Sequence, residues 1–572
     1  MKRLLLGLSF IVCHLSFSYS QSLTVSVDAP GTLATKLTDD VRFTVAELTV
    51  SGPLNADDLK LIQQIADRKK AKNKGDRLLT LLDLSSAVIT GESRELPVGF
   101  LADCKTLETV VLPDSLTSVS RNCFSGCQKL QEVKMPATLM KIDDGAFSKC
   151  TGMTNVELPQ GLVTIGKNAF KGCTLLKTIT IPETVKTIDE DAFSGCKELE
   201  SVSMECGINE VSEGVFTGCE RLTEIVLPTS VKAVGDEAFR DCTSLEKVET
   251  KKGVEKIGKM AFDGCKALTD IDLTMATEIG NGAFQECTSL ATCSLDHIAN
   301  LGSDAFNGCT RLESVTMKGS LKSIGNEAFR GCTSLTSVEM PTTLNTIGKG
   351  SFRGCKSLPE ITLPESLTRI GSNAFEECTS LKTVVIPAMV KQVGSSAFGN
   401  CITLDSVSIN GHLEKIESET FSNCTSLRTV KLPMSVRTIG EKAFKECISL
   451  NNVALPVSLT EIDDNAFERC LSLTSVTLPQ ACTRIGSAAF RDCSALRNVE
   501  LPAGLKKIGG NAFAKCTSLE DVYLRSPLPP SISSNSFKGV TSVCRFAVPK
   551  GSKARYYSDK TWSKVSLLFV EK

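Results

Sequence analysis

Cysteine recurs at a fixed interval through most of this chain of 572 residues. From Cys104 to Cys516 it returns every 23 residues, with two intervals of 22, and a phenylalanine column from Phe124 to Phe513 keeps the same period three residues earlier. A period this regular is typical of stacked copies of one short unit, each burying its apolar side against its neighbours. The sequence therefore predicts a solenoid. The ladder cysteines are Cys104, Cys127, Cys150, Cys173, Cys196, Cys219, Cys242, Cys265, Cys287, Cys309, Cys332, Cys355, Cys378, Cys401, Cys424, Cys447, Cys470, Cys493 and Cys516.

The repeated unit follows the pattern L-x-x-V-x-L-P-x-x-L-x-x-I-G-x-x-A-F-x-x-C, as in the copy from Leu335 to Cys355. Its first part alternates apolar and polar residues, which predicts a half-buried strand, and proline then removes a ladder donor and ends that strand. L-x-x-I predicts a second extended piece on the opposite side of the coil. Gly, Asp or Ser follows the Ile (Gly166, Asp189) and predicts a corner, because these residues tolerate turn geometry. A-F-x-x-C is too short for a regular helix and predicts one tight helical turn.

This pattern resembles the leucine-rich repeat superfamily and, within it, the bacterial 23-residue subclass found in BspA-like surface proteins. The resemblance covers roughly residues 96–540. It implies a curved leucine-rich repeat solenoid with two short parallel strands per coil and about 20 coils, closed by an α/β N-terminal cap and a small C-terminal cap. Members of the family are typically exported, and several act as adhesins or antigens. The family has no catalytic residue set that could be transferred to this chain.

The first 20 residues have the pattern of a secretory signal peptide. Lys2 and Arg3 precede an apolar run at 4–17, and Ser18-Tyr19-Ser20 is a small-x-small cleavage site. The run is shorter than the ~18 residues that a membrane span needs, and lipoprotein processing at Cys13 remains an alternative. We therefore expect an exported protein, secreted or at the cell surface, with the periplasm also possible and no transmembrane span.

Two end segments depart from the repeat and are interpreted as caps that cover the last apolar layers. Residues 21–95 contain two strand-like stretches, then Asn55 as the N-cap of an amphipathic helix, and a degenerate repeat strand at 79–84. The basic run at 68–74 is interpreted as a solvated helix end rather than a ligand patch. Residues 541–572 break the period and hold three of the five Tyr and Trp residues of the chain, including the single Trp.

The composition disfavours two classes of ligand. With 64 basic and 65 acidic residues, the chain has no net charge that would draw it to nucleic acid or anionic lipid. One Trp and four Tyr are few for a protein that stacks on carbohydrate. Neither nucleic acid nor anionic lipid is therefore expected as a partner, and stacking of aromatic side chains on carbohydrate is not expected either.

The cysteines raise the question of disulfides, which are common in exported chains. Ladder neighbours sit one coil apart with parallel side chains, about 5 Å, whereas a disulfide needs Cβ atoms near ~3.8 Å and turned toward each other. Buried free thiols are therefore expected, and Cys293, which replaces the strand Val, should join the core. A pair among four off-ladder cysteines stays open. These are Cys123, Cys206, Cys482 and Cys544.

No catalytic or metal-binding motif is present in the sequence. There is no H-E-x-x-H, no G-x-S-x-G and no G-x-G-x-x-G after a strand. No C-x-x-C occurs, and only His297 and His412 remain after signal removal. We expect no enzyme activity, no metal and no cofactor.

What remains is the outward face of the first strand, where the residues on either side of the Val point to solvent. Over the 19 Cys-marked coils these 38 positions hold seventeen Ser or Thr, ten acidic residues and three Lys. This predicts a long, polar, mildly acidic concave platform for a protein partner, with a generic soluble surface as the alternative. One aromatic and no Arg mean that affinity should be spread over many contacts. The candidate partner-binding residues are Glu249, Asp272, Thr316, Ser337, Glu339, Glu360, Thr362 and Thr383.

Taken together, the sequence predicts an exported, non-enzymatic interaction protein, an adhesin or antigen that binds host extracellular matrix or another cell surface. Two alternatives stay open: an exported structural scaffold without a specific ligand, and a glycan-binding array of Ser and Thr.

Overall fold

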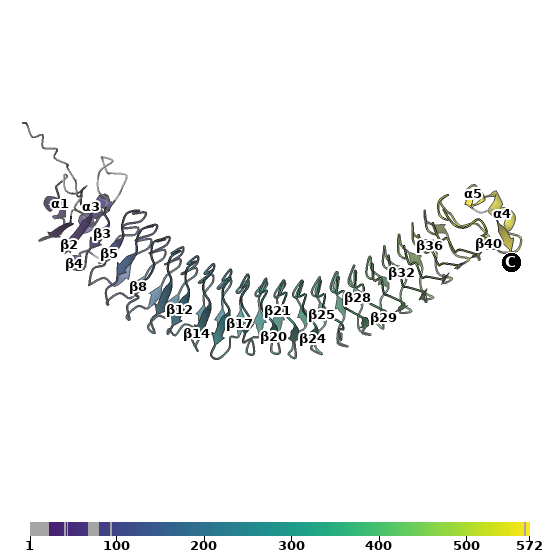
Figure 1. Ribbon diagram of the computed structural model, residues 1–572, viewed down its shortest axis with the longest axis horizontal. Coiled ribbons are helices and arrows are strands. Elements are labelled where there is room, and N and C mark those ends of the chain that lie inside the picture. The colour runs from purple at the N-terminus through teal and green to yellow at the C-terminus, as the bar shows by residue number, and fades with distance from the viewer. Residues whose placement is uncertain (1–21, 39–41, 43, 67–78, 92–93, 566–567) are drawn as a thin grey trace, which may run out of the picture. The chain divides into compact units, whose positions relative to one another are not determined.

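The structure is a computed structural model that describes residues 22–38, 42, 44–66, 79–91, 94–565 and 568–572 (Figure 1). The chain divides into two compact units, residues 1–176 and 177–572. The expected signal peptide at 1–20 and the basic run at 68–74 lie outside the described residues. No helix within the described ranges is long and apolar enough to cross a membrane.

The first unit begins with parallel strands that already follow the repeat geometry. β1 pairs with β2, β2 pairs with β3, and β3 pairs with β5, so the expected degenerate strand near Leu82 is confirmed as part of the same sheet. The elements of this unit are β1 (Ser22–Ser26), α1 (Leu33–Lys36), β2 (Glu47–Leu54), α3 (Ala56–Ala66), β3 (Leu81–Asp83), β4 (Ala87–Ile89), β5 (Thr109–Val111), β6 (Ser118–Val119), β7 (Glu132–Lys134), β8 (Lys141–Ile142) and β9 (Thr164–Ile165).

A reciprocal capping box starts helix α3. The Asn55 side chain accepts the backbone N–H groups of Asp57 and Asp58 at 3.0 and 3.2 Å, and the Asp58 carboxylate accepts the Asn55 N–H at 3.0 Å. This satisfies N–H groups that would otherwise lack a partner at the helix start, and the predicted N-cap is confirmed. Asp58 is buried and also accepts the N–H groups of Gly31 and Leu33. One carboxylate thus ties the segment before β2 to the helix after it.

In the second unit most coils contribute two short strands, as the sequence predicts. Each strand pairs in parallel with its equivalent in the next coil, as in Ile179↔Val202 and Ile347↔Ile370. We call the strand on the L-x-x-V-x-L stretch the first strand and that on the L-x-x-I stretch the second strand. The period fixes the register, because a one-residue slip would turn every apolar side chain outward.

The first strands of this unit and the strands that continue them to the C-terminus are β10 (Thr178–Ile181), β12 (Ser201–Met204), β14 (Glu224–Leu227), β16 (Lys247–Thr250), β18 (Asp270–Ile271), β20 (Thr292–Ser294), β22 (Ser314–Thr316), β24 (Ser337–Glu339), β27 (Thr383–Ile386), β29 (Ser406–Ile409), β31 (Thr429–Lys431), β33 (Asn452–Val453), β35 (Ser475–Thr477), β37 (Asn498–Leu501), β39 (Asp521–Leu524), β40 (Arg545–Val548) and β41 (Phe569–Glu571). The second strands are β11 (Thr187–Ile188), β13 (Glu210–Val211), β15 (Ala233–Val234), β17 (Lys256–Ile257), β19 (Glu278–Ile279), β21 (Asn300–Leu301), β23 (Ser323–Ile324), β25 (Thr346–Ile347), β26 (Arg369–Ile370), β28 (Gln392–Val393), β30 (Lys415–Ile416), β32 (Thr438–Ile439), β34 (Glu461–Ile462), β36 (Arg484–Ile485) and β38 (Lys507–Ile508).

The stretch around Phe and Cys differs from the expected helical turn. It forms successive tight turns closed by bonds such as Cys332 N–H to the Phe329 carbonyl, and two positions per coil have positive φ, for example Glu327 at 54° and Gly331 at 71°. A right-handed helical turn cannot contain such residues. The prediction of one helical turn is therefore wrong, because the backbone reverses its hand twice within this segment.

The interior of each coil is built from the Phe and Cys columns. The rings of Phe329 and Phe352 are parallel and their centroids lie 5.3 Å apart, and the same stacking continues from Phe193 to Phe537 within this unit. From Cys219 to Cys516, each ladder thiol donates its S–H to the Phe carbonyl of the preceding coil, as Cys332 does to Phe306 at 3.3 Å. The thiols therefore link neighbouring coils by hydrogen bonds, and the predicted burial of the ladder cysteines is confirmed.

An aromatic cluster follows the last ring of the Phe column. Phe537 stacks on Phe513 but meets Phe546 nearly edge-on, at 84° between planes. Trp562 is fully buried, and its indole N–H donates to the Pro530 carbonyl at 2.7 Å. Helix α4 (Lys553–Ser558) contributes Tyr556 to this cluster and helix α5 (Trp562–Val565) contributes Trp562. The segment thereby packs aromatic side chains against Phe537, the last ring of the Phe column.

Candidate functional site

The predicted partner-binding residues lie on or directly beside the first strands of the second unit. Parallel pairing places them in columns, as in Thr316↔Glu339 and Ser314↔Ser337 between β22 and β24. Glu360 and Thr383 form a single bridge between neighbouring coils. Because buried Val and Leu alternate with these residues, their side chains point away from the core. The first-strand face is thus a row of polar side chains fixed in register.

The structure places all eight predicted residues at the surface. Seven of them are exposed, and Thr316 is half-buried. Two of the acidic side chains have local roles: Asp272 accepts the N–H and hydroxyl of Thr274 at 3.0 and 2.6 Å, and Glu249 lies 3.5 Å from Lys247. Glu339 and Glu360 make no ion pair with any described residue. Glu339 and Glu360 thus leave two free carboxylates in successive coils of this face.

One position read from the same pattern does not face solvent. Asp521 on β39 is buried, and Arg545 donates to both of its carboxylate oxygens, at 2.8 and 2.6 Å. The reason is that β40 pairs with β39 and brings Arg545 directly beside Asp521. Here the expected outward-facing acid instead anchors the strand that follows the repeats.

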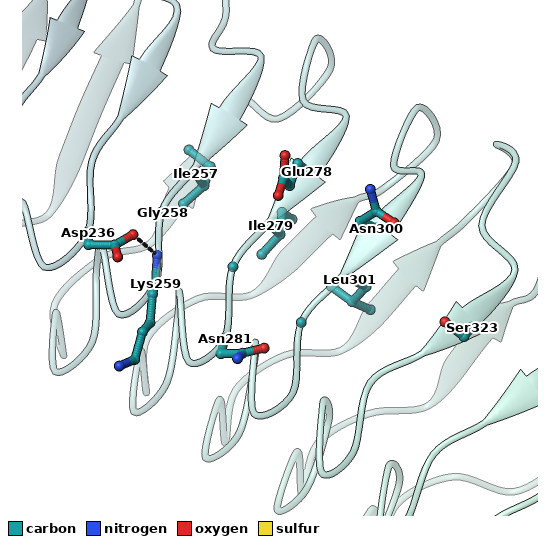
Figure 2. Close-up of a pocket in the computed structure, with 12 residues that line it drawn as sticks. Asp236, Ile257, Gly258, Lys259, Glu278, Ile279, Asn281, Asn300, Leu301 and Ser323 are labelled. Atoms are coloured by element: carbon teal, nitrogen blue, oxygen red, sulfur yellow. Dashed lines mark hydrogen bonds between the residues drawn. The ribbon is translucent and has the colours of Figure 1, made fainter.

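A shallow trough of about 430 Å³ lies along second strands β17, β19, β21 and β23. Figure 2 shows Glu278 and Asn300 on one side of the buried Ile257, Ile279 and Leu301, with Asn281 on the other side. Both sides of the trough are thus polar. Its remaining lining residues are Asp236, Gly258, Lys259, Gly280, Gly302 and Ser323.

Glycines form the floor of this trough, for a reason that differs from the sequence interpretation. They occupy the position after the Ile, where turn geometry was expected to favour glycine, yet their φ angles are ordinary. A Cβ on Gly280 would lie 2.7 Å from the carbonyl carbon of Gly258, and one on Gly302 would lie 2.5 Å from the amide nitrogen of Asn281. Close approach of successive coils excludes a side chain at these places. Eight successive coils share this feature, at Gly235, Gly258, Gly280, Gly302, Gly325, Gly348, Gly371 and Gly394.

The trough was not predicted, although the sequence carried a signal for it. The two 22-residue intervals fall between Cys265 and Cys309, and each loses its residue in the link between first and second strand. The second strands of these two coils, β19 and β21, line the trough. The only breaks in the period thus mark the place where this surface is hollowed.

The described histidines and cysteines are either isolated or buried. No group of three or more His, Cys, Asp or Glu among the described residues could hold a metal ion, and His297 and His412 are exposed in separate coils. Burial raises the pKa of ladder thiols such as Cys378 and Cys401, that of Cys401 to about 12. Such thiols stay protonated at neutral pH and are poor nucleophiles. The off-ladder cysteines at 123, 206, 482 and 544 are buried as well.

The repeat sequence decides the family. The model described as "BspA type Leucine rich repeat region (6 copies)" matches residues 95–223, 209–334, 299–428 and 414–544, which together make up more than half of the chain. The chain belongs to this family. BspA-type leucine-rich repeat proteins are scaffolds that generally bind proteins and are generally not enzymes. No curated protein matches the chain in sequence.

Several of the solved structures to which this chain is similar are bacterial leucine-rich repeat proteins. One from Bacteroides ovatus ATCC 8483 is 24% identical, covers 84% of this chain and 90% of its own, and gives a TM-score of 0.29. A leucine rich cell surface protein from Faecalibacterium prausnitzii A2-165 is 28% identical over 60% of this chain and 86% of its own, with a TM-score of 0.37. These TM-scores are low, so the family assignment rests on the sequence match.

Proposed function

We propose that this BspA-type repeat protein is exported and binds a protein partner, host extracellular matrix or another cell surface, through its first-strand face. The observation that carries the proposal is the register of that face. Polar side chains lie in fixed columns across consecutive strands, with the unpaired carboxylates of Glu339 and Glu360 in successive coils.

The face suits a partner that is itself long or repetitive. No coil of the candidate region carries an aromatic or Arg anchor on this face, so no single coil provides a hot spot. Weak contacts repeated over several coils add up only when the partner spans them together. Matrix proteins, which present repeated modules, meet this requirement.

The test begins with purified extracellular matrix proteins immobilised separately and probed with the chain lacking residues 1–20. For a protein that binds, a triple variant, Glu249→Lys, Glu339→Lys and Glu360→Lys, should weaken affinity about 10-fold, because each exposed charge contributes ~0.5 kcal/mol. A matched control is Glu183→Lys, Glu205→Lys and Glu365→Lys, which reverses three exposed acids at the corners.

Equal loss in both triple variants would reject the first-strand face as the binding surface. Fractionation of the producing cells tests export separately, since the proposal requires the protein at the surface or in the medium rather than inside the cell.

A further inference from the structure

On the second-strand face of four successive coils, every charged side chain is a cation. This face comprises the two residues before the buried Ile or Val and the second residue after it, in the coils between residues 320 and 395. Each coil supplies one exposed cation, and we call this set the basic row. The basic row consists of Lys322, Lys349, Arg369 and Lys391. The other eight positions hold uncharged polar side chains, namely Ser323, Asn326, Asn345, Thr346, Thr368, Ser372, Gln392 and Ser395.

The cations of the basic row lack the acidic partners found elsewhere on this face. In coils to the N-terminal side, Lys232 lies 3.4 Å from Glu255 and Lys256 lies 3.6 Å from Glu278. In a coil to the C-terminal side, Lys415 lies 3.0 Å from Glu417. No member of the basic row makes an ion pair within the described part of the chain.

Two other groups of charged side chains define the extent of the basic row. Glu327, in the turn beside it, is already held by Arg330 at 2.7 Å. Lys506 and Lys507 also lack a carboxylate partner but occupy a single coil. The stretch at 320–395 is thus the longest run of uncompensated positive charge on the second strands of this unit.

The cations of the basic row follow one another coil by coil. Strands β23, β25, β26 and β28 pair in register, with Ser323↔Thr346, Thr346↔Arg369 and Arg369↔Gln392. The Phe rings beneath these coils repeat every 5.3 Å. One positive charge therefore recurs with every coil, two residues before the buried Ile or Val at Lys322 and Lys391, one before it at Arg369 and two after it at Lys349. Exposed like charges repel one another, and an anionic ligand with a similar repeat would offset that repulsion.

The coils of the basic row also carry a glycine directly after the buried Ile or Val. Gly325, Gly348, Gly371 and Gly394 continue the glycine column of the trough, and a Cβ on Gly325 would lie 2.3 Å from the Gly302 carbonyl oxygen. Ser323 belongs both to the trough lining and to the face that carries the basic row. Close packing of successive coils is thus shared by the trough and the basic row, and no side chain projects from this position.

We propose that the basic row binds an extended anionic polysaccharide. The row supplies one cation for each carboxylate or sulfate along the polymer, and the surrounding Ser, Thr, Asn and Gln supply donors and acceptors for sugar hydroxyls. A single-stranded nucleic acid fits less well, because this face has no aromatic side chain on which bases could stack. This site lies on a different surface from the proposed protein-binding face and uses different residues.

The experiment measures binding of the chain lacking residues 1–20 to heparin, hyaluronate, neutral dextran and duplex DNA, by calorimetry at low and at physiological salt. Heparin is expected to bind, with affinity falling as salt rises. The variant Lys322→Gln, Lys349→Gln, Arg369→Gln and Lys391→Gln should lose about 30-fold, since four exposed contacts are removed together. Thermal melting of each variant confirms that it is folded.

The matched control changes four ion-paired cations at equivalent positions of the same face, Lys141→Gln, Lys232→Gln, Lys256→Gln and Lys415→Gln. It removes the same total charge and should leave heparin affinity nearly unchanged. Binding of hyaluronate as well as heparin would support recognition of carboxylates, and binding of heparin alone would support recognition of sulfates. Equal loss in both variants, equal binding of dextran, tighter binding of duplex DNA, or no binding of either acidic polysaccharide would overturn the proposal.

Discussion

The interior and the surface of the repeats obey different rules. Inside the second unit the Phe rings stack at 5.1–5.8 Å in every recorded pair from Phe193 to Phe537. Outside, in the same coils, the first strands carry unpaired carboxylates at Glu339 and Glu360 while the second strands carry the basic row. The stacked interior holds each coil in place, so outward positions vary independently of the fold. Repetition thus constrains the interior, and the outward positions are free to differ from coil to coil.

The largest effect that would test this comparison comes from raising the pH. Burial raises the pKa of ladder thiols such as Cys378 and Cys401, that of Cys401 to about 12, whereas an unfolded thiol titrates near ~8.5. A thiol whose pKa is higher in the folded than in the unfolded state contributes its full stabilisation at pH values below the unfolded pKa. That stabilisation is lost as the pH rises above the unfolded pKa. Each thiol then costs roughly 1.4 kcal/mol per pH unit, so about ten thiols that unfold together cost on the order of 10 kcal/mol.

The measurement is circular dichroism in urea between pH 8 and pH 10, with alkylation of parallel samples. Thiol labelling should remain low at pH 8 and rise in step with unfolding. A urea midpoint that does not move over this range would contradict the thiol network as described.

The next largest effect separates a core residue from a surface residue of neighbouring coils. Phe329→Ala removes a fully buried ring between Phe306 and Phe352, and the cavity should cost ~3–5 kcal/mol. Ser337→Ala on the first-strand face should stay within ~0.5 kcal/mol. Chemical denaturation of both variants provides the measurement, and equal midpoints would reverse the assignment of inward and outward positions.

The smallest effect concerns the positive-φ positions of the turns. Lys149 has φ of 59°, whereas the equivalent residues of the adjacent coils, Gly126 and Gly172, are glycines. Lys149→Gly should raise the free energy of unfolding by roughly 1 kcal/mol, because only glycine adopts this conformation without steric cost. Thr174→Gly, at an ordinary φ nearby, should instead lower it by ~0.5–1 kcal/mol. Destabilisation by both changes would show that the left-handed backbone costs nothing here.

The sequence predicted the features that depend on periodicity. The two strands per coil, the buried Phe and Cys columns and the capping residue Asn55 all follow from spacing and residue type, and the structure confirms them. The left-handed backbone at Glu327 and Gly331 was not predicted, because it depends on backbone angles that side-chain spacing does not encode. Asp521 was misplaced because its partner Arg545 lies outside the repeat. The candidate residues for partner binding are confirmed as surface residues, and their role remains a proposal.

The second-strand face was missed for another reason. Its columns of Lys, Arg, Ser and Asn are as readable in the sequence as those of the first strand, but the pattern presented its glycines as corner residues. Only the coil-to-coil distances at Gly280 and Gly302 show that the close approach of successive coils requires glycine there.

The two 22-residue coils have a consequence for how such a gene can change. Their rings still stack at 5.2 Å between Phe262 and Phe284 and at 5.1 Å between Phe284 and Phe306, so the loss of a residue in the link leaves the core aligned. Every coil presents the same interior to its neighbours, which makes coils interchangeable during recombination between repeats. Unequal crossing-over can therefore delete or duplicate whole coils and still yield a protein that folds. The number of coils can then vary by inheritance, and with it the number of contact positions on both faces.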